Sequence, residues 1–198
     1  MKQTFKFLIF IFLYFTLQGC STIPIMSMYK LSQLDPLSAD PQQIRIAVRT
    51  SKVFSVQKGD VRMSIGYQAD DNSLIIDDLY LVEVIHGGYL QKELLEDLQD
   101  NEAVTIMHLS VSDATQMHVT QKLIANRNAN GLKGKGSFGV GIDASCLSSA
   151  LPSDELLVDV FIQTDPKASF YVISENLNLF AQDGAESIKQ WPICSDAK

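Results

Sequence analysis

The sequence predicts a single α+β domain with a mainly antiparallel β-sheet of about seven strands, one main helix and one shorter helix. Short runs with alternating apolar residues recur along the chain, which is typical of strands that bury one face. The helical patterns fall in the middle, after three consecutive strand patterns, so strands and helices do not alternate as in a doubly wound fold. The 198 residues suffice for one domain with a real core.

The first strand is expected from Ile44 to Thr50, where apolar and polar residues alternate and leave one polar face. Val61 to Tyr67 and Leu74 to Ile85 enclose the turn residues Asp70 to Ser73, so these two segments are expected to pair as a hairpin. The other expected strands cover residues 104–111, 138–142, 156–162 and 170–173. No internal repeat is visible.

Two segments have helical patterns. Within Tyr89 to Leu98, four leucines lie at helical spacing and predict the shorter helix. The main helix is expected from Asp113 to about Asn128, because Ser112 can cap its N-terminus and Gly131 follows its end.

The N-terminus has the layout of a secretory signal. Lys2 and Lys6 precede an uncharged apolar run from Phe7 to Leu17, and Gly19 follows. Eleven helical residues cover only about half of the roughly 30 Å hydrocarbon core of a bilayer. The segment is therefore expected to be a cleaved leader, residues 1–19, and not a permanent span.

Leu17-Gln18-Gly19-Cys20 resembles the lipobox of bacterial lipoproteins, although Gln18 departs from the small or branched residue usual there. The resemblance implies cleavage before Cys20 and attachment of acyl chains such as palmitate to this residue. Two or three chains anchor a protein stably without a spanning helix. Residues 20–43 would then be a lipidated tether and residues 44–198 a periplasmic domain. Ser21, by the sorting rule of enteric-type lipoproteins, implies the outer membrane.

The charge of the chain argues against nucleic acid as a partner. Loss of the leader removes Lys2 and Lys6 but no acid, so the net charge falls from −7 to −9. An acidic domain repels phosphate backbones, and the longest basic candidate, Lys133 to Lys135, holds only two lysines.

Cys146 and Cys194 remain once Cys20 is assigned to lipid. An exported pair of cysteines predicts a structural disulfide, which would hold the C-terminal tail against the domain. The alternative is a reactive thiol, but neither cysteine has a neighbouring histidine or a Cys-x-x-Cys spacing that would lower its pKa.

Gly134 to Gly139 satisfies the G-x-G-x-x-G spacing of dinucleotide-binding loops. In those loops a strand precedes the glycines and a helix follows, so that the helix N-terminus meets the phosphate. Here a helix precedes and a strand follows. The segment is therefore expected to be a flexible turn into a strand, with Gly139 and Gly141 allowing a bulge or a close backbone approach.

No catalytic, cofactor or metal site is predicted. His86, His108 and His118 lack the spacing of zinc ligands, and no G-x-S-x-G nucleophile motif occurs. The acidic pairs Asp70-Asp71 and Asp77-Asp78 lack the calcium-loop pattern and are interpreted as solvated turns.

These features favour a non-catalytic envelope lipoprotein, held in the bilayer by acyl chains on Cys20, that binds a protein partner or supports envelope assembly. Two alternatives stay open. An envelope hydrolase acting on peptidoglycan, lipid or polysaccharide could assemble its site from distant residues. A carrier of lipid or another small ligand would need an apolar cavity within the sheet core.

Overall fold

The computed structural model describes residues 38–85, 89–142, 146–149, 155–183 and 193–194; Cys20 and His86 lie outside this part. In chain order the elements are β1 (Arg45–Ser51), β2 (Phe54–Ser55), β3 (Val61–Ala69), β4 (Ile75–Val84), α3 (Lys92–Leu95), β5 (Glu102–Leu109), α4 (Val111–Ala129), β6 (Gly134–Ile142), β7 (Cys146–Leu147), β8 (Leu157–Gln163), β9 (Tyr171–Asn178) and α5 (Leu179–Asp183).

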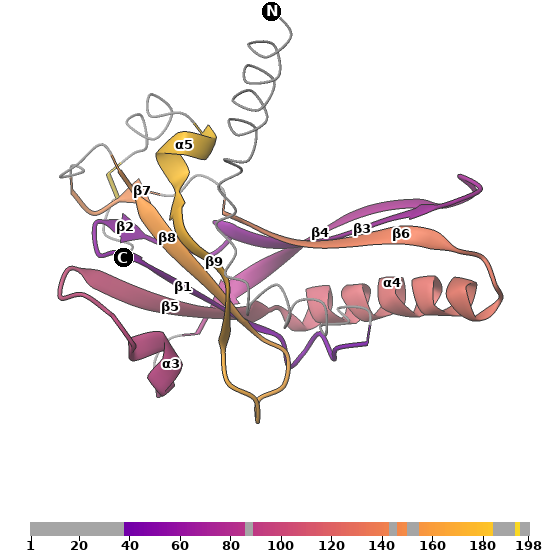
Figure 1. Cartoon of the computed structure of the whole chain (residues 1–198), viewed down its shortest axis with the longest axis horizontal. Coiled ribbons are helices and arrows are strands. Elements are labelled where there is room, and N and C mark those ends of the chain that lie inside the picture. The colour runs from indigo at the N-terminus through magenta and orange to yellow at the C-terminus, as the bar shows by residue number, and fades with distance from the viewer. Residues whose placement is uncertain (1–37, 86–88, 143–145, 150–154, 184–192, 195–198) are drawn as a thin grey trace, which may run out of the picture.

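Seven strands form one antiparallel sheet in the order β6-β3-β4-β5-β1-β8-β9 (Figure 1). The short strands β2 and β7 form a separate pair. The predicted α+β class, the mainly antiparallel sheet, the β3–β4 hairpin and the single domain are confirmed. The short elements β2, β7 and α5 were not predicted from the sequence.

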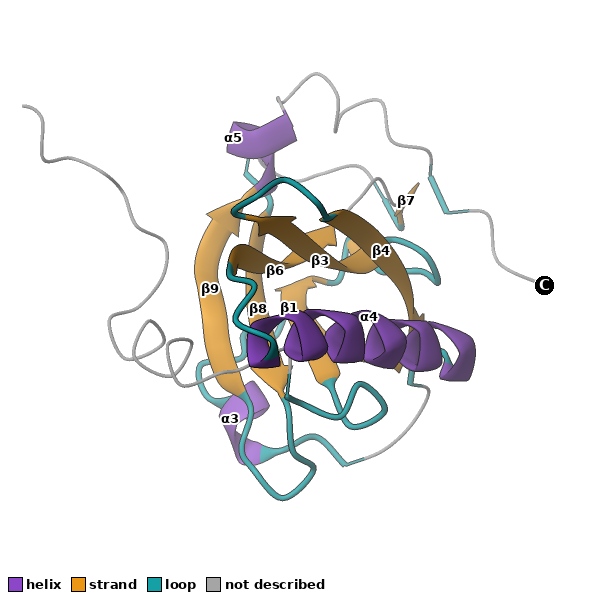
Figure 2. Ribbon diagram, turned by 90° about the vertical axis from the view of Figure 1, so that its right-hand side faces the viewer, coloured by secondary structure: helices purple, strands orange, loops and turns teal. Residues whose placement is uncertain are grey.

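The strands β6, β3 and β4 form an arm that lies along α4. β4 pairs with β3 from Ile75 to Leu81 but with β5 only from Val82 to Val84, so the arm extends beyond β5. Figures 1 and 2 show α4 running beneath this arm while the sheet curls around the core.

The main core fills the inside of the curled sheet. It combines the inward-facing residues of β3 with Met117 and Ile124 of α4, which are fully buried. The outer face of β1 is also covered, because Ala47 and Phe161 pack in a second cluster with Leu94 of α3. β1 is therefore enclosed on both faces, although one of them carries Arg45 and Arg49 as the alternation predicts.

The helix α4 begins two residues before the predicted start. Ser110, not Ser112, is its N-cap, and the Ser110 side chain accepts a hydrogen bond from the backbone N–H of Asp113 at 3.0 Å. The strand expected over residues 104–111 includes Val111, but this residue begins α4 and its side chain is 76% exposed. The predicted end is confirmed, since Gly131 adopts the left-handed conformation with φ of 77°.

The shorter predicted helix is reduced to the single turn of α3. Glu96 is extended, with ψ of 127°, and Asp97 adopts a positive φ of 60°. One turn already places Leu94 in the second cluster, whereas Leu95 is 44% exposed, so further helix would bury little. Short helices are marginal without such packing.

Polar side chains join the arm to α4. Thr120 Oγ1 donates to Asp78 Oδ2 at 2.7 Å, and the buried hydroxyl of Tyr80 donates to the same oxygen at 3.0 Å. Burial raises the pKa of Tyr80 to about 12. The pair Asp77-Asp78 therefore lies within β4, and its interpretation as a solvated turn is wrong. Asp71, as predicted, lies in the exposed turn between β3 and β4.

The glycine-rich segment is not a flexible turn but the regular strand β6, which pairs with β3 in nine consecutive steps without a bulge. A close backbone approach is confirmed at Gly139, where an added Cβ would lie 2.8 Å from Ser64 Oγ, but not at Gly141, where it would meet nothing within 4 Å. The tightest approach is at Gly134, where a Cβ would lie 2.5 Å from the Tyr67 ring and 2.6 Å from the Gln68 carbonyl oxygen.

Gly134→Ala should therefore destabilise the domain by about 1–3 kcal/mol, because backbone and ring must move to accept the methyl group. Gly141→Ala is the matched control, with an expected effect between zero and about 1 kcal/mol of stabilisation. Urea unfolding measures both. Equal free energies of unfolding for the two variants would contradict the described packing of β6.

Candidate functional site

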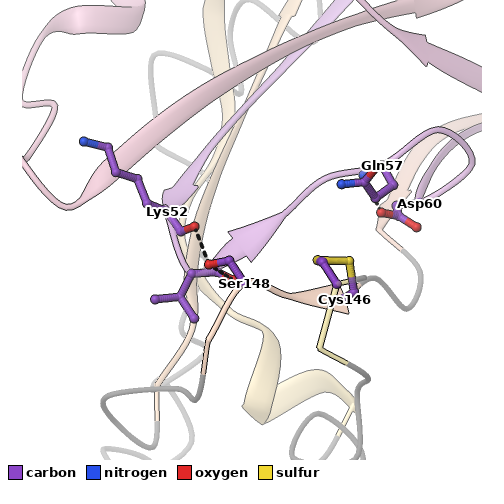
Figure 3. The surroundings of a disulfide bond; sticks show 7 residues. Lys52, Gln57, Asp60, Cys146 and Ser148 are labelled. Carbon is purple, nitrogen blue, oxygen red and sulfur yellow. Dashed lines mark hydrogen bonds between the residues drawn. A yellow bond between two sulfur atoms is a disulfide. The ribbon is translucent and has the colours of Figure 1, made fainter. Parts of the chain in front are cut away.

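The predicted disulfide is present between Cys146 and Cys194, whose Cα atoms lie 4.9 Å apart (Figure 3). Cys146 belongs to β7, and 48 positions separate the two cysteines. Because both sulfurs are bonded, the alternative of a reactive thiol at either cysteine does not apply to this structure.

Backbone hydrogen bonds reinforce the disulfide. β7 pairs with β2, and Ile193 forms a parallel bridge with Leu147. The N–H of Cys194 donates to the carbonyl oxygen of Leu147 at 2.8 Å. These contacts and the disulfide hold residues 193–194 against β7, so we call this arrangement the C-terminal clamp.

Ser148, which follows β7, hydrogen-bonds to the backbone of a neighbouring segment. Ser148 Oγ lies 3.1 Å from the carbonyl oxygen of Lys52 and 3.2 Å from that of Val53, to which it can donate (Figure 3). These contacts join Ser148 to the segment that follows β1. Figure 3 also shows Gln57 and Asp60, which hydrogen-bond each other in the turn after β2.

A charged cluster that is nearly enclosed lies on the outer side of β1. Arg49 Nε and a terminal guanidinium nitrogen both donate to Asp159 Oδ2, at 2.9 and 2.7 Å, and both side chains are nearly buried. The guanidinium also donates to the carbonyl oxygen of Glu96 and lies 5.3 Å from the Phe161 ring centroid. Asp159 Oδ1 accepts the backbone N–H of Asn176 at 2.7 Å.

This Arg49–Asp159 cluster joins β1, β8, β9 and the end of α3. Each oxygen of Asp159 has a donor, and Asn176 has a positive φ of 51° that directs its N–H to the carboxylate. A buried ion pair with satisfied hydrogen bonds fits a positioning role in the fold better than a role in catalysis.

Sequence reasoning missed this cluster, although a signal was present. Asp159 is the one charged residue of β8, and Arg49 is one of two arginines in β1. Charged residues in such largely apolar strands are seldom buried without a partner. Because 110 positions separate the two residues, the pairing itself needs the register of β1 with β8.

The described histidines lie apart from the clamp. On β5, His108 stands opposite Arg45 of β1 and Glu83 of β4, and His118 is exposed on α4. Within the described residues, no group of three or more His, Cys, Asp or Glu side chains could hold a metal ion. No helix in this part of the chain has the length and apolar character that crossing a bilayer requires.

Comparisons of the chain with protein-family models, curated proteins and solved structures found no match.

Removal of the disulfide should loosen the C-terminal clamp. Replacing Cys146 and Cys194 together by serine is expected to lower the free energy of unfolding by about 4 kcal/mol, since closing a loop of this length restricts the unfolded chain. Chemical unfolding of wild type with and without reductant should reproduce the difference. Thiol labelling of both cysteines in unreduced, mature protein would contradict the bond.

Arg49→Met should destabilise the domain by about 3 kcal/mol, because the nearly buried Asp159 carboxylate loses its charged partner. Lys58→Met is the control, since Lys58 pairs with Glu83 at 2.7 Å on the surface and its loss should leave the free energy of unfolding nearly unchanged. Similar unfolding midpoints for both variants would contradict a structural role for the Arg49–Asp159 cluster.

Proposed function

We propose that this chain is a lipid-anchored envelope protein without catalytic activity, whose single domain binds a protein partner or supports envelope assembly. The observation that carries the proposal is the leader, with its basic start, its apolar run and the lipobox-like sequence ending at Cys20. In this proposal two or three acyl chains on Cys20 hold the mature chain in the outer membrane, and the domain faces the periplasm.

The disulfide gives independent support for export. Structural disulfides persist in oxidising compartments such as the bacterial periplasm and are rare in the cytosol. The bond between Cys146 and Cys194 therefore agrees with a chain that leaves the cytosol, whichever membrane it reaches.

Two polar clusters within the described residues have structural roles. Asp78, Tyr80 and Thr120 bind one another between β4 and α4, and Arg49 and Asp159 bind one another beside β1. Groups held in this way stabilise the packing of elements, whereas a catalytic group needs access to a substrate.

Lipidation can be tested with Cys20→Ser in a Gram-negative host. Wild type should incorporate labelled palmitate, fractionate with the outer membrane and give an acylated N-terminal peptide by mass spectrometry. Cys20→Ser should lose the label and keep its leader, whereas the Cys146→Ser/Cys194→Ser control should keep the label. Wild type recovered without lipid would contradict the anchor.

The binding role requires a second measurement. Crosslinking in intact cells should give a recurrent, discrete product with wild type. The matched control carries residues 1–43 fused to an unrelated folded domain, so it has the leader and tether without residues 44–198. If a folded and anchored wild type gives no product beyond those of the control, the binding role is contradicted even though the anchor stands.

A further inference from the structure

The two terminal strands of the seven-stranded sheet, β6 and β9, differ in regularity. At the β9 edge, the register with β8 shifts twice, between Val158 and Val160 and again between Val160 and Phe161, and Asn176 has a positive φ. Such irregularities hinder the addition of another strand. At the β6 edge, pairing with β3 continues for nine steps without a shift. Of the two terminal strands, β6 is therefore the one that retains the regular geometry to which another strand can add.

The hydrogen-bond pattern identifies the backbone groups that β6 leaves outward. The N–H of Asp70 donates to the carbonyl oxygen of Lys133, which makes this a hydrogen-bonded pair of the antiparallel ladder. The alternation then directs the odd-numbered residues of β6 toward β3 and the even-numbered residues away from it. Gly134, Gly136, Phe138, Val140 and Ile142 carry the outward groups. Among the described strands, none other than β3 pairs with β6.

The side chains of β6 leave this edge accessible and its inner face incompletely covered. Four of its nine residues are glycines, so few side chains hinder an approaching backbone. Phe138, Val140 and Ile142 face the core but are only partly buried. Their partners on β3 (Ile65, Met63 and Val61) are at most 1% exposed. An added strand with apolar residues on the core side would cover the part that remains open.

The charge at this edge differs from that of the chain as a whole. Lys135 is the only charged residue of β6, and Lys133 directly precedes the strand, whereas the chain without its leader has a net charge of −9. Lys135 lies on the outer face of the sheet, opposite Gln68. An acidic residue on the outer face of an added strand would be attracted to this position, and a basic one repelled.

We infer that β6 is the binding site for the protein partner, which adds an extended segment to this edge as an eighth strand. Apolar residues of the segment alternate toward Phe138, Val140 and Ile142, and acidic residues occupy its other face near Lys135. Main-chain hydrogen bonds supply affinity and the alternate side chains supply selectivity. The inference rests on the proposed partner-binding function and specifies its site.

The test uses the purified, lipidated chain in detergent and a labelled ten-residue probe peptide in which valine alternates with glutamate and threonine. Gly136→Pro removes an outward N–H without removing a bond to β3, and Pro is tolerated at such edge positions. Gly136→Ala is the matched control, because its Cβ would meet only the Gly66 carbonyl oxygen at 3.9 Å.

Wild type and Gly136→Ala should bind the peptide by fluorescence anisotropy, with slowed amide exchange at Gly136, Phe138 and Val140. Gly136→Pro should bind about tenfold more weakly or not at all while unfolding at a similar urea concentration. A peptide with lysine in place of glutamate should bind more weakly than the acidic probe.

Three results would overturn the inference: no binding by wild type, equal binding by Gly136→Pro, or preference for the lysine peptide. Concentration-dependent dimers that Gly136→Pro abolishes would assign the edge to a second copy of this chain instead. The cellular crosslinking separates the two proposals. A crosslinked product that persists in Gly136→Pro would leave the binding function standing and remove β6 as its site.

Discussion

The pairing of β1 with two distant strands is the constraint on which the other parts of the structure depend. β1 lies between β5 and β8, with Ile46 opposite both Met107 and Ile162. The chain continues from β5 into α4 and β6, and from β8 into β9. Because β1 is covered on both faces, its register must satisfy two packed layers and two ladders together.

The seven strands of the large sheet could be predicted at least in part, because each contains an alternation or run of apolar residues, as in Val61 to Tyr67. The ends of the helices were harder to predict from the sequence. Val111 is apolar, yet its side chain is exposed in the first turn of α4, directly after the N-cap Ser110. Leu90 and Leu98 belong to the expected shorter helix, but only Lys92–Leu95 is helical in the structure. The local sequence pattern does not show which apolar side chains are buried by tertiary packing.

Of the two side-chain sites, the disulfide could be predicted from the sequence and the Arg49–Asp159 cluster could not. Cys146 and Cys194 could be paired because the expected lipidation of Cys20 leaves only these two cysteines. The Arg49–Asp159 cluster depends instead on sheet register across 110 positions. Glycine gave an ambiguous signal, because the same residues suit turns and close strand contacts. At Gly134 and Gly139, atoms of β3 lie so close that a side chain would clash, so glycine there serves a close strand contact. The two predictions that depend most on the N-terminus, lipidation and location, lie outside the described residues.

The position of β1 also affects the order in which the chain can fold. Its partner β8 begins at Leu157, so most of the polypeptide must be synthesised before both sides of the first long strand are paired. Topologies dominated by such distant contacts fold slowly, because a long loop must close before the contacts form. If the chain crosses the inner membrane as proposed, this delay would keep the newly made polypeptide unfolded long enough for a translocation channel to accept it.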